Sequence, residues 1–150
     1  MKPIILLTVF TLLIAGCSNQ NGHLSGGSKP YSYEEAISKG DVVFFNDVHN
    51  VEKFNQFLTD LGNKKVSSIR VTGYTDEGDP IFKDLKYDGE VIHYTYDNSN
   101  DKFGGTQKGV RTDTCSKVTS EKVEGEVQYT LDGCTNNDTE MSYFLLRTKK

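Results

Sequence analysis

The chain has 150 residues, of which 17 are basic and 21 acidic, so its formal net charge is −4. This length accommodates one ordinary domain rather than two, and the periodic apolar segments exclude a chain that is disordered throughout. The acidic balance argues against a protein that binds the phosphate backbone of nucleic acid, so we expect no nucleic-acid partner.

The N-terminus has the pattern of an export signal. Lys2 provides a short positive region, and the apolar run at 4–15 is about a dozen residues long, shorter than the roughly 20 that span a bilayer. The run ends in Leu-Ile-Ala-Gly-Cys at 13–17, which resembles the lipobox of bacterial lipoproteins. That resemblance implies a signal peptide at 1–16 and acylation, for example with palmitate, of Cys17. An ordinary signal peptide with a chance cysteine and an uncleaved anchor are the alternatives.

Acylation places the rest of the chain outside the cytosol. Two or more acyl chains give stable attachment, so the expected location is the extracytoplasmic face of the cell membrane, with the lipid anchor as the membrane contact. Gly, Ser and Asn dominate residues 18–30, which cannot bury a core and are typical of a flexible tether. We therefore divide the mature chain into the lipidated cysteine and tether at 17–30 and a single domain at 31–150.

The domain opens with a short helix and a strand. Ser32 and Glu35 have the spacing of a capping box, and Gly40 is a typical residue after a helix end, which predicts a helix at 33–39. The apolar run at 41–45 is too short for a helix and predicts a buried strand.

The main helix is predicted at 51–61. Asn50 is a plausible N-cap and Gly62 a plausible stop. The apolar residues recur at the spacing of one helical face: Val51, Phe54, Phe57, Leu58 and Leu61.

After residue 66 the apolar pattern changes to alternation, which predicts strands at 67–75, 80–87 and 90–97. The turns at 76–78 and 88–89 are typical hairpin loops, and they fix which residues face each other. The expected core face contains the row Ile69, Leu85 and Ile92. The expected outer face contains a polar row of Arg70, Asp84 and His93.

The polar row is one candidate for chemistry. Asp84 has the character needed to orient His93 as a base. However, the sequence offers no nucleophile beside them, and a solvated strand face has the same composition. Residues Asp47, His49 and Asn50 precede the main helix, where a ligand site and ordinary helix capping are both plausible. We therefore assign no catalytic residue.

The polar segment at 98–113 is a predicted long loop and, on length alone, a candidate for recognition. Just before and within it, residues Asp97–Asp101 place side-chain oxygens at alternate positions, as calcium loops do. Lys102 and Lys108 stand where an EF-hand requires Gly and Glu, which favours an Asx-rich turn over a calcium site. We therefore expect no metal and no cofactor.

The C-terminal segment predicts a disulfide. A two-residue turn at 124–125 places Cys115 opposite Cys134, and the export signal implies an oxidising compartment. A redox pair and a metal site are the weaker alternatives, because there is no Cys-x-x-Cys spacing and no histidine near either cysteine. A final strand is predicted at 141–147.

Several short motifs together resemble a family of small lipoproteins from Gram-positive bacteria, known as domain of unknown function 4362. The resemblance extends from Tyr33 to about Leu146. It implies export and the outer face of a cell membrane, and it implies no activity. The motifs are Gly40-Asp41-Val42-Val43, Glu77-Gly78-Asp79-Pro80-Ile81, Tyr94-Thr95-Tyr96-Asp97-Asn98-Ser99, Lys102-Phe103-Gly104, Arg111-Thr112-Asp113-Thr114-Cys115 and Gly133-Cys134.

These features predict an α+β domain, with a largely antiparallel sheet of about six strands and the helices at 51–61 and 33–39 packed on it. The leading functional hypothesis is a membrane-anchored, non-enzymatic binding module whose ligand is a protein or another cell-envelope component. The alternative is a small hydrolase or calcium-dependent protein that uses Asp84 and His93 or the segment Asp97–Asp101.

Overall fold

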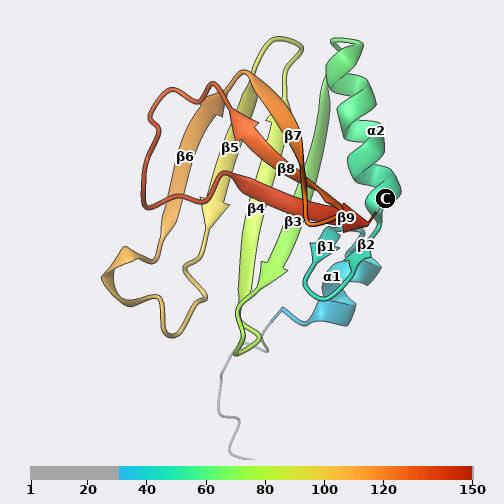
Figure 1. Cartoon of the computed structure of the whole chain (residues 1–150). Helices are drawn as coiled ribbons and strands as arrows, with labels where there is room; N and C mark the ends of the chain where they lie inside the picture. Colours follow the sequence, from blue (N-terminus) through green and yellow to red (C-terminus); the bar gives the residue numbers. More distant parts are fainter. Residues whose placement is uncertain (1–30, 150) are drawn as a thin grey trace, which may run out of the picture.

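The computed structural model describes residues 31–149. The predicted signal peptide, Cys17 and the tether at 18–30 lie outside the described residues. Within the described range, two α-helices and nine strands form a mixed α+β domain, with one six-stranded and one three-stranded sheet (Figure 1).

The α+β class and the largely antiparallel pairing are confirmed, but the strands form two sheets rather than the one sheet of about six strands that was predicted. The order of the six-stranded sheet is β2-β1-β3-β4-β5-β6, and every neighbouring pair is antiparallel except β1 and β3, which are parallel. The parallel pair forms because α2 connects β2 to β3 and returns the chain to the sheet beside β1. The bounds are β1 Val42–Phe44, β2 Val48–His49, β3 Ser67–Tyr74, β4 Pro80–Tyr87, β5 Ile92–Asp97 and β6 Val110–Cys115.

Both predicted helices are present. In α1 (Tyr33–Lys39), the Ser32 hydroxyl accepts a hydrogen bond from the Glu35 N–H at 3.2 Å, and Gly40 ends the helix with φ of 87°. In α2 (Val51–Gly62), Phe54 and Phe57 are fully buried.

The ends of α2 differ from the prediction. Gly62 still belongs to the helix, and Lys64 rather than Gly62 adopts positive φ, 53°. At the other end, Asn50 occupies the predicted N-cap position, but its side chain makes no capping hydrogen bond. It donates instead to the Ile37 and Asp41 carbonyls, at 3.1 and 2.7 Å. Asn50 therefore fixes α2 to the connection between α1 and β1.

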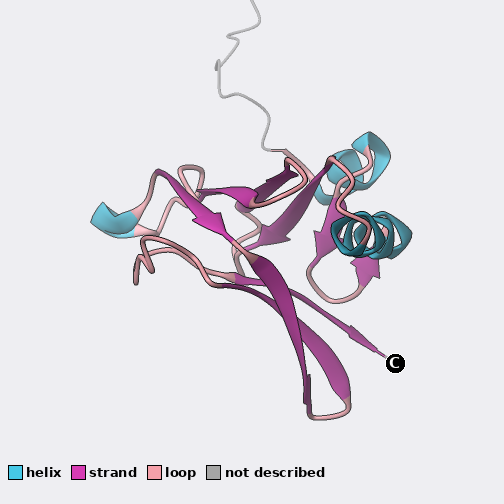
Figure 2. Cartoon of the chain, turned by 90° about the horizontal axis from the view of Figure 1, so that it is seen from above, coloured by secondary structure: helices cyan, strands magenta, loops and turns pink. Residues whose placement is uncertain are grey.

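The three-stranded sheet, order β7-β8-β9, was not predicted as a separate layer. Its strands are β7 Lys117–Val123, β8 Glu126–Asp132 and β9 Phe144–Lys149. Only Ser116 separates β6 from β7, so the chain leaves the first sheet abruptly at this point. Figure 2 shows the β7–β8 hairpin extending away from the first sheet.

The β7–β8 turn has the predicted register. Lys117 lies opposite Asp132 and Val118 opposite Leu131, around a turn in which Glu124 and Gly125 have φ of 53° and 87°. Two positive φ values match the type of turn that joins two strands through two residues.

The pairing of β4 with β5 is shifted by two residues from the predicted register. Ile69 lies opposite Leu85 as expected, but Leu85 lies opposite Tyr94 rather than Ile92. The reason is the turn: the Asp88 carboxylate accepts hydrogen bonds from the Glu90 and Val91 N–H groups, both at 2.9 Å. This local hydrogen bonding makes the connection four residues long instead of two.

Two further boundaries were wrong. The predicted loop at 98–113 ends earlier, because β6 begins at Val110, and it contains a short 3-10 helix at Gly105–Gln107. The last strand begins at Phe144 rather than at residue 141, because residues 133–143 form an irregular connection.

The core lies between the inner face of the six-stranded sheet, α2 and the three-stranded sheet. It includes side chains from every layer: Val42, Phe54, Phe57, Val71, Leu85, Ile92, Tyr94, Leu131, Leu145 and Leu146.

Candidate functional site

The predicted polar row is present only in part. Arg70 and Asp84 lie opposite each other, and two hydrogen bonds of 2.7 Å join the guanidinium to the carboxylate. The hydrogen bond with Asp84 raises the pKa of Arg70, and the guanidinium carbon lies 4.8 Å from the ring centre of Phe82. This pair is a solvent-exposed ion pair on the outer face of the sheet.

His93 does not join this row. The shifted register places it opposite Lys86, while Thr95 lies opposite Asp84. The His93 Nε2 atom lies 2.8 Å from the Asp88 carboxylate. Hydrogen bonds from the Val91 and Glu90 N–H groups, and then from His93, lower the pKa of Asp88 to about 2. The predicted pairing of Asp84 with His93 is therefore wrong, and the turn residue Asp88 takes the place of Asp84.

The oxygen-rich segment Asp97–Asp101 folds as a series of Asx turns. Asp97 accepts from the Ser99 N–H at 2.9 Å, Asn98 from the Gly109 N–H at 2.8 Å and Asp101 from the Phe103 N–H at 2.9 Å. Asp97 and Asp101 thus form Asx turns with backbone two residues on, as the Asx-turn alternative anticipated, while Asn98 closes the loop across eleven residues.

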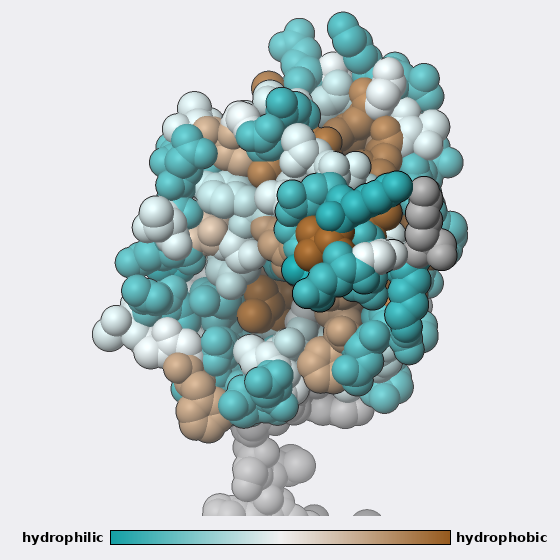
Figure 3. All heavy atoms as spheres, in the orientation of Figure 1, coloured by the Kyte–Doolittle hydropathy of each residue, from teal (hydrophilic) through white to brown (hydrophobic). Residues whose placement is uncertain are grey.

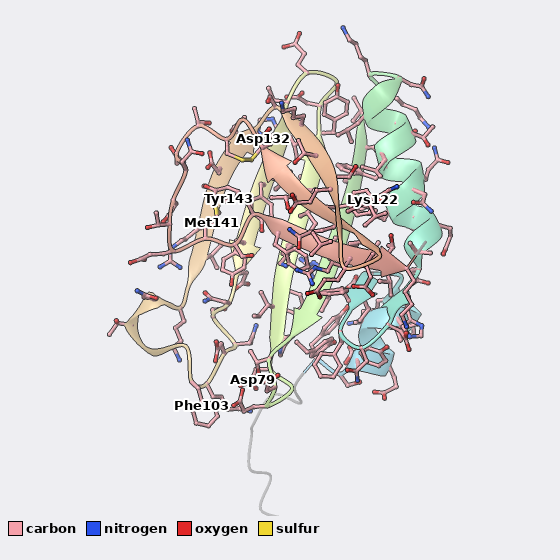
Figure 4. All side chains as sticks on the ribbon, viewed as in Figure 1. Asp79, Phe103, Lys122, Asp132, Met141 and Tyr143 are labelled. Atoms are coloured by element: carbon pink, nitrogen blue, oxygen red, sulfur yellow. A yellow bond between two sulfur atoms is a disulfide. The ribbon has the colours of Figure 1, made fainter. Side chains whose placement is uncertain are left out.

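Sequence reasoning missed the contact that fastens this loop to the rest of the domain. Asp79, 2% exposed, accepts from the Lys102 N–H at 2.9 Å and from its ammonium at 2.8 Å. The Lys102 side chain lowers the pKa of Asp79. Figure 4 shows Asp79 and Phe103 at the same end of the molecule. Phe103 is 74% exposed.

The residues before α2 do not converge on a site at the helix terminus. His49 packs edge-on against Tyr33, with ring centres 5.5 Å apart, while Asn50 is engaged with the α1–β1 connection. Asp47 points instead toward the end of β9, where its carboxylate lies 3.7 Å from the Lys149 ammonium.

Cys115 and Cys134 form a disulfide in the structure. Among residues 31–149, these two sulfurs and Asp113 are the only group of three potential metal-ligating side chains of the Asp, Glu, His and Cys types that converges. Because the sulfurs are bonded to each other, they are not available as thiolate ligands. The disulfide joins the end of β6 to the segment after β8, and thus links the two sheets.

A cleft of about 470 Å³ lies where β2 and the start of α2 face the first residue of β8 and the last residues of β9. Acidic and basic side chains share its walls: Asp47 from the connection between β1 and β2, and Glu126, Arg147 and Lys149 from the second sheet. Phe44 provides an apolar floor and contacts Phe144 edge-on, with ring centres 5.4 Å apart.

A second pocket, of about 210 Å³, also includes Phe44 in its wall. Lys83, Tyr96 and Phe144 line it as well. Lys83 is 7% exposed although it is charged, and burial lowers its pKa to about 8. Sequence reasoning missed this site, because a lysine in an alternating strand is normally assigned to the solvent-facing side. The cleft and this pocket together form the inter-sheet site.

The visible face of the molecule is mostly hydrophilic (Figure 3), with an apolar strip between the β7–β8 hairpin and α2. Partly buried Leu58 and Leu61 of α2 and Val118 of β7 pack against the core. None of the described helices is long and apolar enough to cross a membrane.

Comparison with known proteins gave one match. No curated protein and no solved structure is similar enough to match the chain. A family described as domain of unknown function (DUF4362) matches residues 39–130. This range includes the whole six-stranded sheet, α2, β7 and most of β8. Because the match covers more than half of the 150 residues, the chain belongs to the family of domain of unknown function 4362.

Proposed function

We propose that the protein is a lipid-anchored, extracytoplasmic binding module that holds a ligand from the cell envelope at its inter-sheet site. The observation that carries this proposal is the cleft of about 470 Å³ with walls from both sheets. Ligand sites are typically concave, with an apolar surface and a few placed polar groups. In this cleft Phe44 provides an apolar surface, and Asp47 and Arg147 provide polar groups.

The lipid anchor is supported by the sequence at 13–17, where small residues precede Cys17 at the end of an apolar run. The described domain starts at Tyr31, so 13 residues separate Cys17 from it. As a random coil, a Gly- and Ser-rich segment of this length spans roughly 20 Å. Such a spacing would hold the acidic domain close to the membrane without embedding it.

The proposal assigns no reaction to the protein. Asp84 and His93, which the hydrolase hypothesis requires together, contact different partners. The carboxylates of Asp97 and Asp101, which the calcium hypothesis requires, accept hydrogen bonds from neighbouring backbone. Neither alternative therefore gains a supporting observation from the geometry.

The anchor is tested by labelling cells with an alkyne analogue of palmitate. The full chain should take up the label and fractionate with membranes, whereas a Cys17→Ala variant should do neither. Ser18→Ala is the matched control, because it changes the neighbouring residue and leaves the thiol. Label and membrane attachment that persist in Cys17→Ala would contradict the proposal.

The binding site is tested with a photo-reactive amino acid at Thr148, which lines the cleft, and at Thr59, which is exposed on α2. Irradiation of intact cells should give a discrete adduct from position 148 and none from position 59. The same adduct from both positions, or none from either, would argue against ligand binding in the cleft.

A further inference from the structure

Lys83 is a cation inside the protein. It lies on β4, opposite Val71 of β3 and Tyr96 of β5, so its side chain belongs to the face that carries the core. Only 7% of the residue is exposed. Its ammonium donates hydrogen bonds to the carbonyls of Phe144 and Leu145 on β9, at 2.8 and 3.5 Å. Lys83 therefore bridges the two sheets.

No carboxylate in the described part of the chain forms an ion pair with Lys83. Buried charges in proteins are normally paired, because taking an ion out of water is costly. Two carbonyl oxygens and the Phe144 ring, whose centre lies 5.0 Å from the ammonium, offset only part of that cost. Within residues 31–149, the charge thus lacks a carboxylate counter-ion.

The pocket beside Lys83 has a volume of about 210 Å³ and a largely aromatic wall that includes Phe44, Tyr96 and Phe144. Tyr96 and Ser142 also line this pocket. Within residues 31–149, the hydroxyl group of neither residue forms a hydrogen bond. The pocket thus combines one unpaired cation, two available hydroxyl groups and an aromatic surface.

We infer that this pocket binds a small carboxylic acid with a compact apolar body, with the carboxylate on the Lys83 ammonium. An aromatic wall favours an apolar body over a hydrated ion such as inorganic phosphate, and a single cation matches a single negative charge. The volume, smaller than that of typical drug-sized sites, limits the ligand to a small molecule. This inference rests on the proposed function and names the class of ligand held in the smaller pocket of the inter-sheet site.

The probe is phenylacetate, and its neutral isostere phenylacetamide is the matched control ligand. Binding is measured by titration calorimetry on the full chain extracted from membranes in a non-ionic detergent. Phenylacetate should bind, and phenylacetamide should bind about ten-fold or more weakly, because it cannot form the charge-assisted hydrogen bond. Equal affinities, or no binding of phenylacetate at about 10 mM, would overturn the inference.

Two variants separate the pocket from the outer surface. Lys83→Met should abolish the preference for the acid over the amide, whereas Lys86→Met should retain it. Lys86 is on the same strand but on the opposite face, where it lies opposite Ser68 and His93. A preference retained in Lys83→Met would locate the binding elsewhere and contradict the inference.

Lys83→Met also removes the hydrogen bonds to β9, so a spectroscopic measurement on the unsubstituted chain provides a second test that does not depend on the folding of a variant. In a protein with ¹³C-labelled lysine side chains, phenylacetate should shift the resonance of Lys83 and raise its pKa, since a nearby anion stabilises the ammonium. Shifts confined to other lysines would overturn the inference. If phenylacetate does not shift the Lys83 resonance but position 148 still gives a cross-linked adduct, the proposed binding function stands and only the carboxylate ligand is contradicted.

Discussion

Asp113 fixes the irregular segment between β8 and β9 through one buried carboxylate. It accepts hydrogen bonds from the N–H groups of Thr114, Thr135 and Asn136, at 2.7 to 3.1 Å, and from the Tyr143 hydroxyl at 2.5 Å. Burial by itself raises the pKa of Asp113, but these hydrogen bonds lower it by more, so the pKa lies below its ordinary value. Figure 4 shows Tyr143 beside Met141 in this segment.

We expect Asp113→Asn to destabilise the fold by about 1–3 kcal/mol at pH 7, because the amide cannot accept four hydrogen bonds at full strength and directs an NH₂ group at N–H donors. A folded-state pKa below the unfolded one gives stability that is present above the unfolded pKa and lost as the pH falls through the folded pKa. Urea unfolding at pH 7 and near pH 3 should therefore show a larger cost of the substitution at pH 7. An equal cost at both pH values would contradict the role of the charge.

Lys83 predicts a dependence on pH of the same sign as Asp113, but at alkaline pH and from the loss of a buried charge. Burial lowers its pKa to about 8, below the unfolded value, so the unfolded chain binds more protons above this pH and the folded state gains stability as the pH rises. Tyr96 lies opposite Lys83 on β5, and burial raises the pKa of Tyr96, which therefore stays neutral in this range. The Arg147 guanidinium lies over the same Phe144 ring as the Lys83 ammonium, 6.0 Å from the ring centre.

Between pH 7 and about 9.5, the stability of the unsubstituted chain should rise relative to Lys83→Met by about 1–2 kcal/mol. Parallel denaturant titrations of both proteins over this range provide the measurement, and Lys86→Met serves as the control. A stability difference between the two proteins that does not change with pH would show that Lys83 is not buried as a cation.

At the scale of elements, α2 is the part of the fold that the sequence predicted best. Its apolar residues recur at helical spacing over three turns, and this pattern depends only on residues close in sequence. The β4–β5 register was wrong because it depends on one hydrogen-bonded turn around Asp88, which composition does not reveal. The second sheet was missed because all its strands alternate as a single larger sheet would, and only the one-residue connection at Ser116 separates the layers.

Phe57→Ala should therefore destabilise the domain by about 3–5 kcal/mol, since the side chain is fully buried and its loss leaves a cavity. Asn55→Ala, on the exposed face of the same helix, should stay within about 0.5 kcal/mol. Chemical denaturation of the two variants and the parent measures both values. Similar losses for the two would mean that α2 does not contribute its predicted face to the core.

The disulfide closes a loop over a sequence separation of 19 residues. By the chain-entropy estimate, replacing Cys115 and Cys134 together with serine should lower the free energy of unfolding by about 3 kcal/mol. Reduction of the parent should produce a similar loss, and labelling of the unfolded, unreduced protein should detect neither thiol. Two reactive thiols in the unreduced protein would contradict the bond.

For the molecule as a whole, the contacts between the two sheets come from a few kinds of interaction. They include the disulfide, the Lys83 ammonium on the carbonyls of β9, and the hydrogen bonds of Asp113 to the segment before β9. The strands β3 and β4 are flanked on both sides within the first sheet, while the β7–β8 hairpin has an exposed end (Figure 2). The three-stranded sheet should therefore be the less stable unit.

Native-state hydrogen exchange on the full chain tests this difference. Amides of β7–β9 should exchange faster than those of β3 and β4, because segments with fewer buried contacts open at lower free energy. Reduction of the disulfide should increase exchange in β7–β9 more than in β3 and β4, since the bond fixes the segment after β8 to the end of β6. Equal increases in both sheets would show instead that they unfold as one unit, in which case the inter-sheet site could not open without global unfolding.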